Sequence, residues 1–206
     1  MISLNDLRKF KAEGRKFSCL TCYDASMAKA MELAEIDTIL IGDSLGMAIQ
    51  GRDSTLPVTV EDMAYHTAAV RRGNQHALIM TDLPFMSYAT LSDALQSSKV
   101  VMQAGAQMVK VEGGAWLAET VQVLTRNGIP VCVHLGLTPQ SVHVFGGYKL
   151  QARTREAADQ LIADCQAVVD AGAAVLLLEC VPAQLGKEIS ELFPHVPVIG
   201  IGAGVD

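Results

Sequence analysis

The stretch MVKVEGGAWLAETVQVLTRNGIPVCVH (108–134) contains two short apolar runs separated by a segment of helix length. The runs MVKVE (108–112) and PVCVH (130–134) have the length and the valine content of buried strands. The segment 115–127 between them has a helical pattern, and Gly128 follows it at the position where a helix commonly ends. The stretch therefore predicts a strand–helix–strand unit, the connection that joins two parallel strands.

The same alternation continues on both sides of this stretch. Strands are expected at 17–22, 37–42, 77–81, 107–112, 130–134, 174–179 and 197–201. Helices are expected from a cap at Ser3 and Asp6 to about Glu13, and at 25–34, 60–72, 91–104, 115–127, 154–171 and 183–192. The residues expected to end helices are Gly73, Gly105, Gly128 and Gly172. Seven strands that alternate with helices predict the α/β class and a parallel sheet with right-handed crossovers.

Such a sheet can stay open and doubly wound, or it can close into a (β/α)8 TIM barrel. Residues able to do chemistry follow strands two to six, which favours the barrel, because an open sheet concentrates its site at one switch point. Barrels typically need about 250 residues, whereas this chain has 206. We therefore expect residues 1–206 to form one barrel domain that is incomplete at its C-terminus and lacks the eighth unit.

Composition narrows the class of protein. Half of the residues are hydrophobic and 18% are charged, below the average of roughly 25%, so a large buried core is expected. The net charge is −6 and the basic residues are dispersed, which argues against nucleic acid or a membrane as a partner. The N-terminal segment 1–14 is charged where a secretory signal needs an apolar core. A soluble cytoplasmic protein is expected.

Cys19 and Cys22 form a C-x2-C pair, which could indicate zinc or redox chemistry. They are expected on one strand, where side chains three positions apart point to opposite faces. No second pair stands at zinc-finger spacing. Reduced cysteines packed as small hydrophobic residues are the better interpretation.

Carboxylates end several of the apolar runs. Asp43 follows 37–42, Asp82 follows 77–81, and Glu112 ends 108–112. Carboxyl ends of parallel barrel strands meet at one mouth, where such groups repel each other unless a hard cation such as Mg2+ binds them. Each aspartate could instead cap a following helix. The two aspartates together with Glu112 favour a metal site.

Lys110 and Glu112 stand two apart on one strand, so both point to the same face. Neither charged side chain suits the layer between strands and helices. We therefore expect both to point into the barrel near its mouth. Lys110 could neutralise a substrate carboxylate, and Glu112 could orient a metal-bound water. A buried structural ion pair is the alternative, although such pairs are costly to bury.

Glu179 and His134 also end strands. Glu179 closes the apolar run AVLLLE (174–179). A partly apolar environment raises the pKa of a carboxylate toward the range that suits a general base. His134 could polarise a carbonyl or bind substrate, or it could simply be a satisfied polar residue. Two segments, 43–59 and 135–153, are long for connections in α/β units, and we expect them to be lids or binding loops.

Longer motifs resemble the ketopantoate hydroxymethyltransferase family along essentially the whole chain. They are IGDSLGM (41–47), GRDSTLPVTVEDMAYHTAAVRRG (51–73), DLPFMSYAT (82–90), VKVEGG (109–114), HLGLTPQSV (134–142), FGGYK (145–149), LLLECVP (176–182) and IGIGAG (199–204). The resemblance implies a (β/α)8 barrel of the phosphoenolpyruvate/pyruvate type. It also implies Mg2+, a homodecamer, and transfer of a hydroxymethyl group from 5,10-methylenetetrahydrofolate to 3-methyl-2-oxobutanoate. The product, 2-dehydropantoate, leads to pantothenate and coenzyme A.

The resemblance also implies a role for each strand-end residue. Asp43 and Asp82 would bind the metal, and Glu112 would reach it through water. The substrate would be held by Ser44, Lys110 and His134. Glu179 would remove the C3 proton to give an enolate that Mg2+ stabilises. Ser44 enters through the resemblance alone.

Two other interpretations remain open. The first is a different Mg2+-dependent enzyme of the phosphoenolpyruvate/pyruvate barrels, a lyase or mutase for 2-oxo acids. Such lyases typically carry a K-K-C-G-H lid motif, which this sequence lacks. The second is an inactive fragment or an assembly-only subunit, which the expected missing unit would explain.

Overall fold

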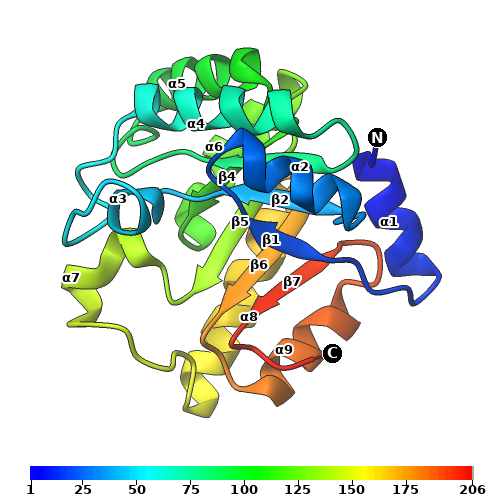
Figure 1. Ribbon diagram of the computed structural model, residues 1–206. Helices are drawn as coiled ribbons and strands as arrows, with labels where there is room; N and C mark the ends of the chain where they lie inside the picture. The colour runs from blue at the N-terminus through cyan, green and yellow to red at the C-terminus, as the bar shows by residue number, and fades with distance from the viewer. Residues whose placement is uncertain (206) are drawn as a thin grey trace.

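A computed structural model describes residues 1–205 and contains seven strands that form one parallel sheet (Figure 1). Each strand pairs in parallel with the next one along the chain, in the order β1 to β7. The strands are β1 (Cys19–Thr21), β2 (Thr38–Ile41), β3 (Leu78–Asp82), β4 (Met108–Glu112), β5 (Val131–Gly136), β6 (Val175–Glu179) and β7 (Val198–Ile201). This order, curled into a nearly closed barrel, confirms the expected fold class for seven β/α units.

The helices alternate with the strands. The longer ones are α1 (Leu4–Ala12), α2 (Ala25–Leu33), α4 (Val60–Gly73), α5 (Leu91–Ala104), α6 (Ala118–Arg126), α8 (Arg155–Asp170) and α9 (Ala183–Leu192). Short helices lie in the connections after strands: α3 (Leu45–Ala48), η1 (Ala115–Leu117), η2 (Pro139–Ser141) and α7 (Val142–Phe145). Figure 1 shows α1 on the right and α3 and α7 on the left, at opposite ends of the strands.

The sheet separates two apolar clusters. The larger one lies between strands and helices and includes Ile39, Ile79, Val109 and Val111. The smaller one fills the barrel interior with residues from all seven strands, among them Cys19, Leu40, Leu78, Met80, Met108, Cys132, Val175, Leu177 and Ile199. Helix α1 adds Leu7 and Phe10 to the interior. The N–H of Ile2 donates to the carbonyl of His76, just before β3, so α1 covers the amino ends of the strands. Burial of each large apolar side chain contributes about 1.5–3 kcal/mol.

Most of the expected element ends hold within a few residues. The capping box of Ser3 and Asp6 is present at α1. Strand β1 is shorter than the expected 17–22, because its pairing with β2 covers three residues. The expected helix 115–127 begins with the tighter turn η1 before α6. Cys19 packs in the interior cluster and Cys22 in the outer one, so the two diverge as expected.

Gly73 does not end a helix in the expected way. Gly105, Gly128 and Gly172 have positive φ angles at or just after helix ends, whereas Gly73 is the last helical residue of α4, and Asn74 is the cap. A Cβ atom at position 73 would lie 2.2 Å from the carbonyl oxygen of Ala25. The glycine is therefore explained by the close approach of α2 and α4.

No helix within residues 1–205 has both the length and the apolar character that crossing a bilayer requires. The five cysteines are free.

Candidate active site

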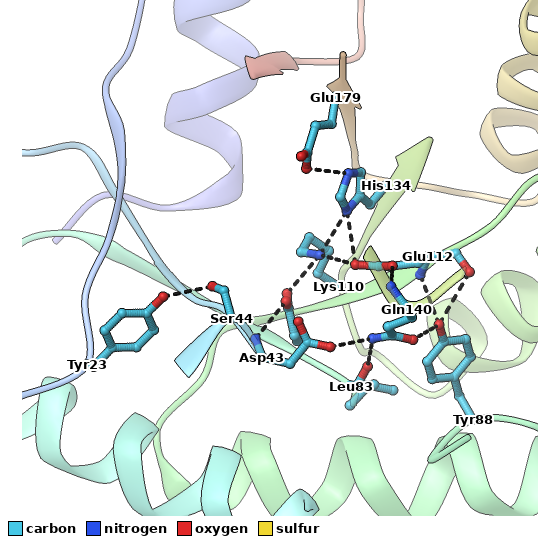
Figure 2. Close-up of polar contacts among 11 residues, drawn as sticks. Tyr23, Asp43, Ser44, Leu83, Tyr88, Lys110, Glu112, His134, Gln140 and Glu179 are labelled. Carbon is cyan, nitrogen blue, oxygen red and sulfur yellow. Dashed lines mark hydrogen bonds and ion pairs between the residues drawn. The ribbon is translucent and has the colours of Figure 1, made fainter. Parts of the chain in front are cut away.

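The nominated strand-end residues meet at the carboxyl ends of the strands, on the side opposite α1. A cavity of about 240 Å³ opens there. The nominated residues that line it are Asp43, Ser44, Asp82, Lys110, Glu112, His134 and Glu179. Figure 2 shows the side chains of Asp43, Lys110, Glu112 and His134 converging in a chain of polar contacts, with Glu179 beside the ring of His134. Parallel pairing of β3, β4, β5 and β6 brings their carboxyl ends to one mouth.

Three buried carboxylates form the centre of this cavity. One oxygen from each of Asp43, Asp82 and Glu112 lies within 4.8 Å of the others. The backbone N–H of Asp43 donates to Asp82 Oδ2 at 3.1 Å. Asp82 Oδ1 is buried and pairs with the ammonium of Lys110 at 3.1 Å. Three buried carboxylates clustered around one cation, Lys110, are an oxygen-rich set that fits a hard divalent cation such as Mg2+.

The electrostatics of these carboxylates support the same fit. Burial, together with the charges of Asp82 and Glu112, raises the pKa of Asp43 to about 8. Burial also raises the pKa of Asp82, against the opposing charge of Lys110. Burial acts to raise the pKa of Glu112 as well, but Lys110 and His134 outweigh it and hold that pKa at about 2. A bound cation would favour the charged form of all three.

Lys110, Glu112 and His134 form a buried polar chain from β4 to β5. Lys110 Nζ lies 3.4 Å from Glu112 Oε1 and 3.1 Å from His134 Nδ1. His134 Nδ1 lies 3.2 Å from Glu112 Oε1, and Nε2 lies 3.2 Å from Glu179 Oε2. Burial and the charge of Lys110 act to lower the pKa of His134, but its hydrogen bonds to Glu112 and Glu179 outweigh them and raise it. These polar contacts link the carboxylate cluster to Glu179 through His134.

Glu179 is the most accessible of these acids. It ends β6 with 18% of its side chain exposed, whereas the Glu112 side chain is 2% exposed. Its position at the rim leaves the carboxylate open to a molecule that enters the cavity. Backbone geometry fixes this position, because Gly136 has a φ of +86°, and a Cβ atom there would lie 2.4 Å from the carbonyl oxygen of Glu179.

Ser44 lies at the rim beside Tyr23. The two hydroxyl oxygens are 2.7 Å apart. A Cβ atom at Gly42 would lie 2.8 Å from Ser44 Oγ and 3.6 Å from Asp82 Oδ2, so the glycine leaves room between these groups. Tyr23 was missed from the sequence, because an aromatic residue just after a strand carries no distinctive signal.

The alternative of helix capping does not describe the two aspartates. Ser44 is the cap residue of α3 and makes no capping hydrogen bond. Asp82 is the last residue of β3, and the next long helix, α5, is capped by Thr90. Lys110 and Glu112 do form a buried ion pair, and both also line the cavity.

Sequence reasoning also missed Gln140 and Tyr88, which contact the carboxylate cluster. Gln140 lies in the long segment 135–153 that was expected to be functional. The segment was identified by its length, but nothing in its composition distinguishes the glutamine that turns inward. Tyr88 stands in the β3–α5 connection, where its residue type alone does not indicate a contact with the carboxylates.

A family model described as ketopantoate hydroxymethyltransferase matches residues 1–206. A protein of Acinetobacter baumannii (strain AYE) named 3-methyl-2-oxobutanoate hydroxymethyltransferase is 93% identical over 204 residues, covering 99% of this chain and 76% of the relative. A protein of the same name from Psychrobacter sp. (strain PRwf-1) is 65% identical, covering 100% of this chain and 76% of the relative.

Solved structures with a similar fold are much more distant in sequence. Phosphonopyruvate hydrolase in complex with oxalate and Mg2+ matches with a TM-score of 0.68 at 14% identity, covering 98% of this chain and 81% of the other. A 2,3-dimethylmalate lyase, described as a member of the PEP mutase/isocitrate lyase superfamily, matches with a TM-score of 0.65 at 15% identity, covering 98% and 81%. At these identities the likeness concerns the fold alone.

Proposed function

Because this chain belongs to the ketopantoate hydroxymethyltransferase family, we propose that the barrel mouth performs the family reaction with Mg2+ and 5,10-methylenetetrahydrofolate. The enzyme is a hydroxymethyltransferase of pantothenate biosynthesis, and its acceptor is 3-methyl-2-oxobutanoate. The observation that carries the proposed mechanism is the convergence of three buried carboxylates with an accessible fourth, Glu179, in one cavity.

The carboxylate cluster is the proposed cation site. Asp43 and Asp82 would bind Mg2+ directly, and Glu112 would reach it through water. When bound, the cation supplies Lewis-acid stabilisation of the negative charge that develops on the 2-oxo acid. Side chains of the protein are proposed to bind the substrate and to remove its proton.

Ser44, Lys110 and His134 are proposed to hold the substrate. Lys110 is a buried cation surrounded by acids, and its ammonium lies where it can face a substrate carboxylate in the cavity. Ser44 adds a hydroxyl donor from the rim, beside Tyr23. His134 presents its ring between Glu112 and Glu179, within reach of a substrate oxygen. Together these groups orient C3 of the keto acid toward Glu179.

Glu179 is proposed to be the general base. It takes the proton from C3, and the electron pair of the C–H bond forms a new bond from C3 to the methylene carbon of the folate. Both bonds from that carbon to the folate nitrogens break, and water supplies the hydroxyl group of the product. The proton taken from C3 and one proton of the water end on the two folate nitrogens, which gives tetrahydrofolate. A base of this kind contributes about 10²–10⁴-fold to rate.

We expect the purified protein to form 2-dehydropantoate from 3-methyl-2-oxobutanoate only when Mg2+ and methylenetetrahydrofolate are both present. Omission of the folate removes the carbon donor and should abolish product. Removal of Mg2+ by chelation should slow turnover at least about 100-fold, because Lewis-acid stabilisation is worth several kcal/mol. Product is measured by NMR or mass spectrometry.

The same assay tests the rival function. The fold likeness to a 2,3-dimethylmalate lyase makes folate-independent cleavage of a 2-hydroxy or 2-oxo diacid the alternative. If the protein cleaves such a diacid without folate and forms no 2-dehydropantoate with folate, the lyase function replaces the proposed hydroxymethyl transfer. Family resemblance further supports a homodecamer in the cytoplasm, and sedimentation of the purified protein tests the decamer.

Gly136→Ala is expected to disturb Glu179 through the backbone. The new Cβ would meet the Glu179 carbonyl oxygen at 2.4 Å in a left-handed residue. Stability should fall by roughly 2–5 kcal/mol, the sum of the left-handed and overpacking costs. Turnover should fall by on the order of 100-fold, as displacement of a catalytic group by about 1 Å can cause. Both are measured, by denaturant unfolding and by product formation.

Gly128→Ala is the matched control. Gly128 has a φ of +80°, and a Cβ atom there would have nothing within 4 Å. This variant should lose about 1–2 kcal/mol of stability and keep its turnover. Equal turnover in the two variants would contradict the role given to Gly136.

A further inference from the structure

Gln140 connects the long segment 135–153 to the carboxylate cluster. It lies in η2 and is 6% exposed. Its backbone N–H donates to Glu112 Oε2 at 2.9 Å, and its side-chain Nε2 donates to Asp43 Oδ2 at 2.9 Å. Figure 2 shows the amide between Asp43, Leu83 and Tyr88. One residue thus contacts two of the three clustered carboxylates.

The orientation of the Gln140 amide is determined by its neighbours. Nε2 also donates to the carbonyl of Leu83 at 2.9 Å, and a carbonyl can only accept. The opposite end, Oε1, accepts from the hydroxyl of Tyr88 at 2.6 Å. That hydroxyl accepts in turn from the backbone N–H of Glu112 at 3.2 Å. Both N–H groups of the amide are therefore used, and its two ends cannot be exchanged.

The hydrogen bonds leave a regular pattern on the three carboxylates. Asp43 Oδ2 is held by the Gln140 side chain, Glu112 Oε2 by the Gln140 backbone, and Asp82 Oδ2 by the backbone of Asp43. One oxygen of each acid is anchored to neutral donors. The second oxygens of Asp82 and Glu112 face the ammonium of Lys110, at 3.1 and 3.4 Å.

We propose that Gln140, held by Tyr88, is a positioning residue that sets the carboxylates of Asp43 and Glu112 for a divalent cation. This inference rests on the proposed function, in which the cluster binds Mg2+. Ligands that are already oriented lose less freedom when the cation binds, and removal of such an outer hydrogen bond typically weakens metal affinity about 10- to 100-fold. Gln140 also ties the position of the segment 135–153 to the cluster.

Gln140→Met isolates the amide, because methionine has a similar length and volume and keeps the backbone N–H that donates to Glu112. We expect Mg2+ to bind this variant about 10- to 100-fold more weakly in a calorimetric titration without substrate. Circular dichroism and thermal unfolding of the cation-free protein establish that it folds. Gln166→Met is the matched control, since Gln166 is exposed on α8 and its side chain donates to Asp170. Its Mg2+ affinity should equal that of the wild type.

Tyr88→Phe provides the second variant and removes only the hydroxyl that holds Oε1. Its Mg2+ affinity should fall about 2- to 10-fold, the value of one hydrogen bond. A folded Gln140→Met variant with wild-type affinity overturns the positioning role alone. If Gln140→Met does not fold, unchanged affinity in Tyr88→Phe overturns it. A wild-type protein that binds no Mg2+ overturns the proposed cation site, and the positioning role with it.

Discussion

Glu179→Gln is expected to abolish the exchange of the C3 proton of 3-methyl-2-oxobutanoate with deuterium. The amide has no basic oxygen to take the proton, yet its carbonyl can still accept from His134 Nε2, which lies 3.2 Å from the carboxylate in the wild type. Loss of a general base lowers the rate about 10²–10⁴-fold. Proton NMR in deuterated water, with Mg2+ and no folate, measures this step separately from carbon transfer.

The binding of Mg2+ distinguishes loss of the base from loss of the site. Glu179 lies outside the group of three clustered carboxylates, so the variant should titrate with Mg2+ as the wild type does. Glu188→Gln makes the same change at an exposed position of α9 and should leave exchange unaltered. Exchange at the wild-type rate in Glu179→Gln would show that another group removes the proton.

Asp43→Asn is expected to have opposite effects on cation binding and on the stability of the cation-free protein. The substitution removes one of the charges proposed to bind Mg2+, so the affinity should fall at least about 100-fold. It also removes the charge whose repulsion by Asp82 and Glu112, added to burial, raises the pKa of Asp43 to about 8. The asparagine oxygen can still accept from Gln140 Nε2, which keeps the local hydrogen bond.

The pH dependence follows from the sign of this shift. Asp43 binds its proton more tightly in the folded than in the unfolded protein, so the cation-free wild type loses stability as pH rises from about 4 to about 8. The variant should lack this contribution and be the more stable of the two at pH 8. Denaturant unfolding in chelator across this range measures it. Asp159→Asn, on the exposed face of α8, is the control, and equal pH profiles for Asp43→Asn and wild type would contradict the prediction.

The convergence of the strand-end residues could be predicted because it depends on local rules. Alternation of strands and helices determines parallel pairing, and the two-residue period of a strand places Lys110 and Glu112 on one face. Gln140 could not be predicted in this way. Its contacts with Asp43 and Leu83 span 97 and 57 residues, and they depend on the path of an irregular segment that has no period.

Gly73 illustrates a second limit. A glycine at the end of a helical pattern indicates a cap, and three of the four candidate glycines follow that rule. The fourth is instead required by the carbonyl of Ala25, on a different helix. Sequence position cannot separate these two causes, because the second depends on how α2 and α4 pack.

The separation of the two apolar clusters by the sheet gives the parity of a strand position a physical meaning. In β4, Val109 and Val111 face the helices, where an apolar residue of similar volume is tolerated at a cost below about 1.5 kcal/mol. Lys110 and Glu112 face the cavity, where removal of one partner leaves an uncompensated buried charge and costs about 3–5 kcal/mol. Neighbouring residues of β4 are therefore under different physical constraints, Val109 and Val111 on volume and Lys110 and Glu112 on charge.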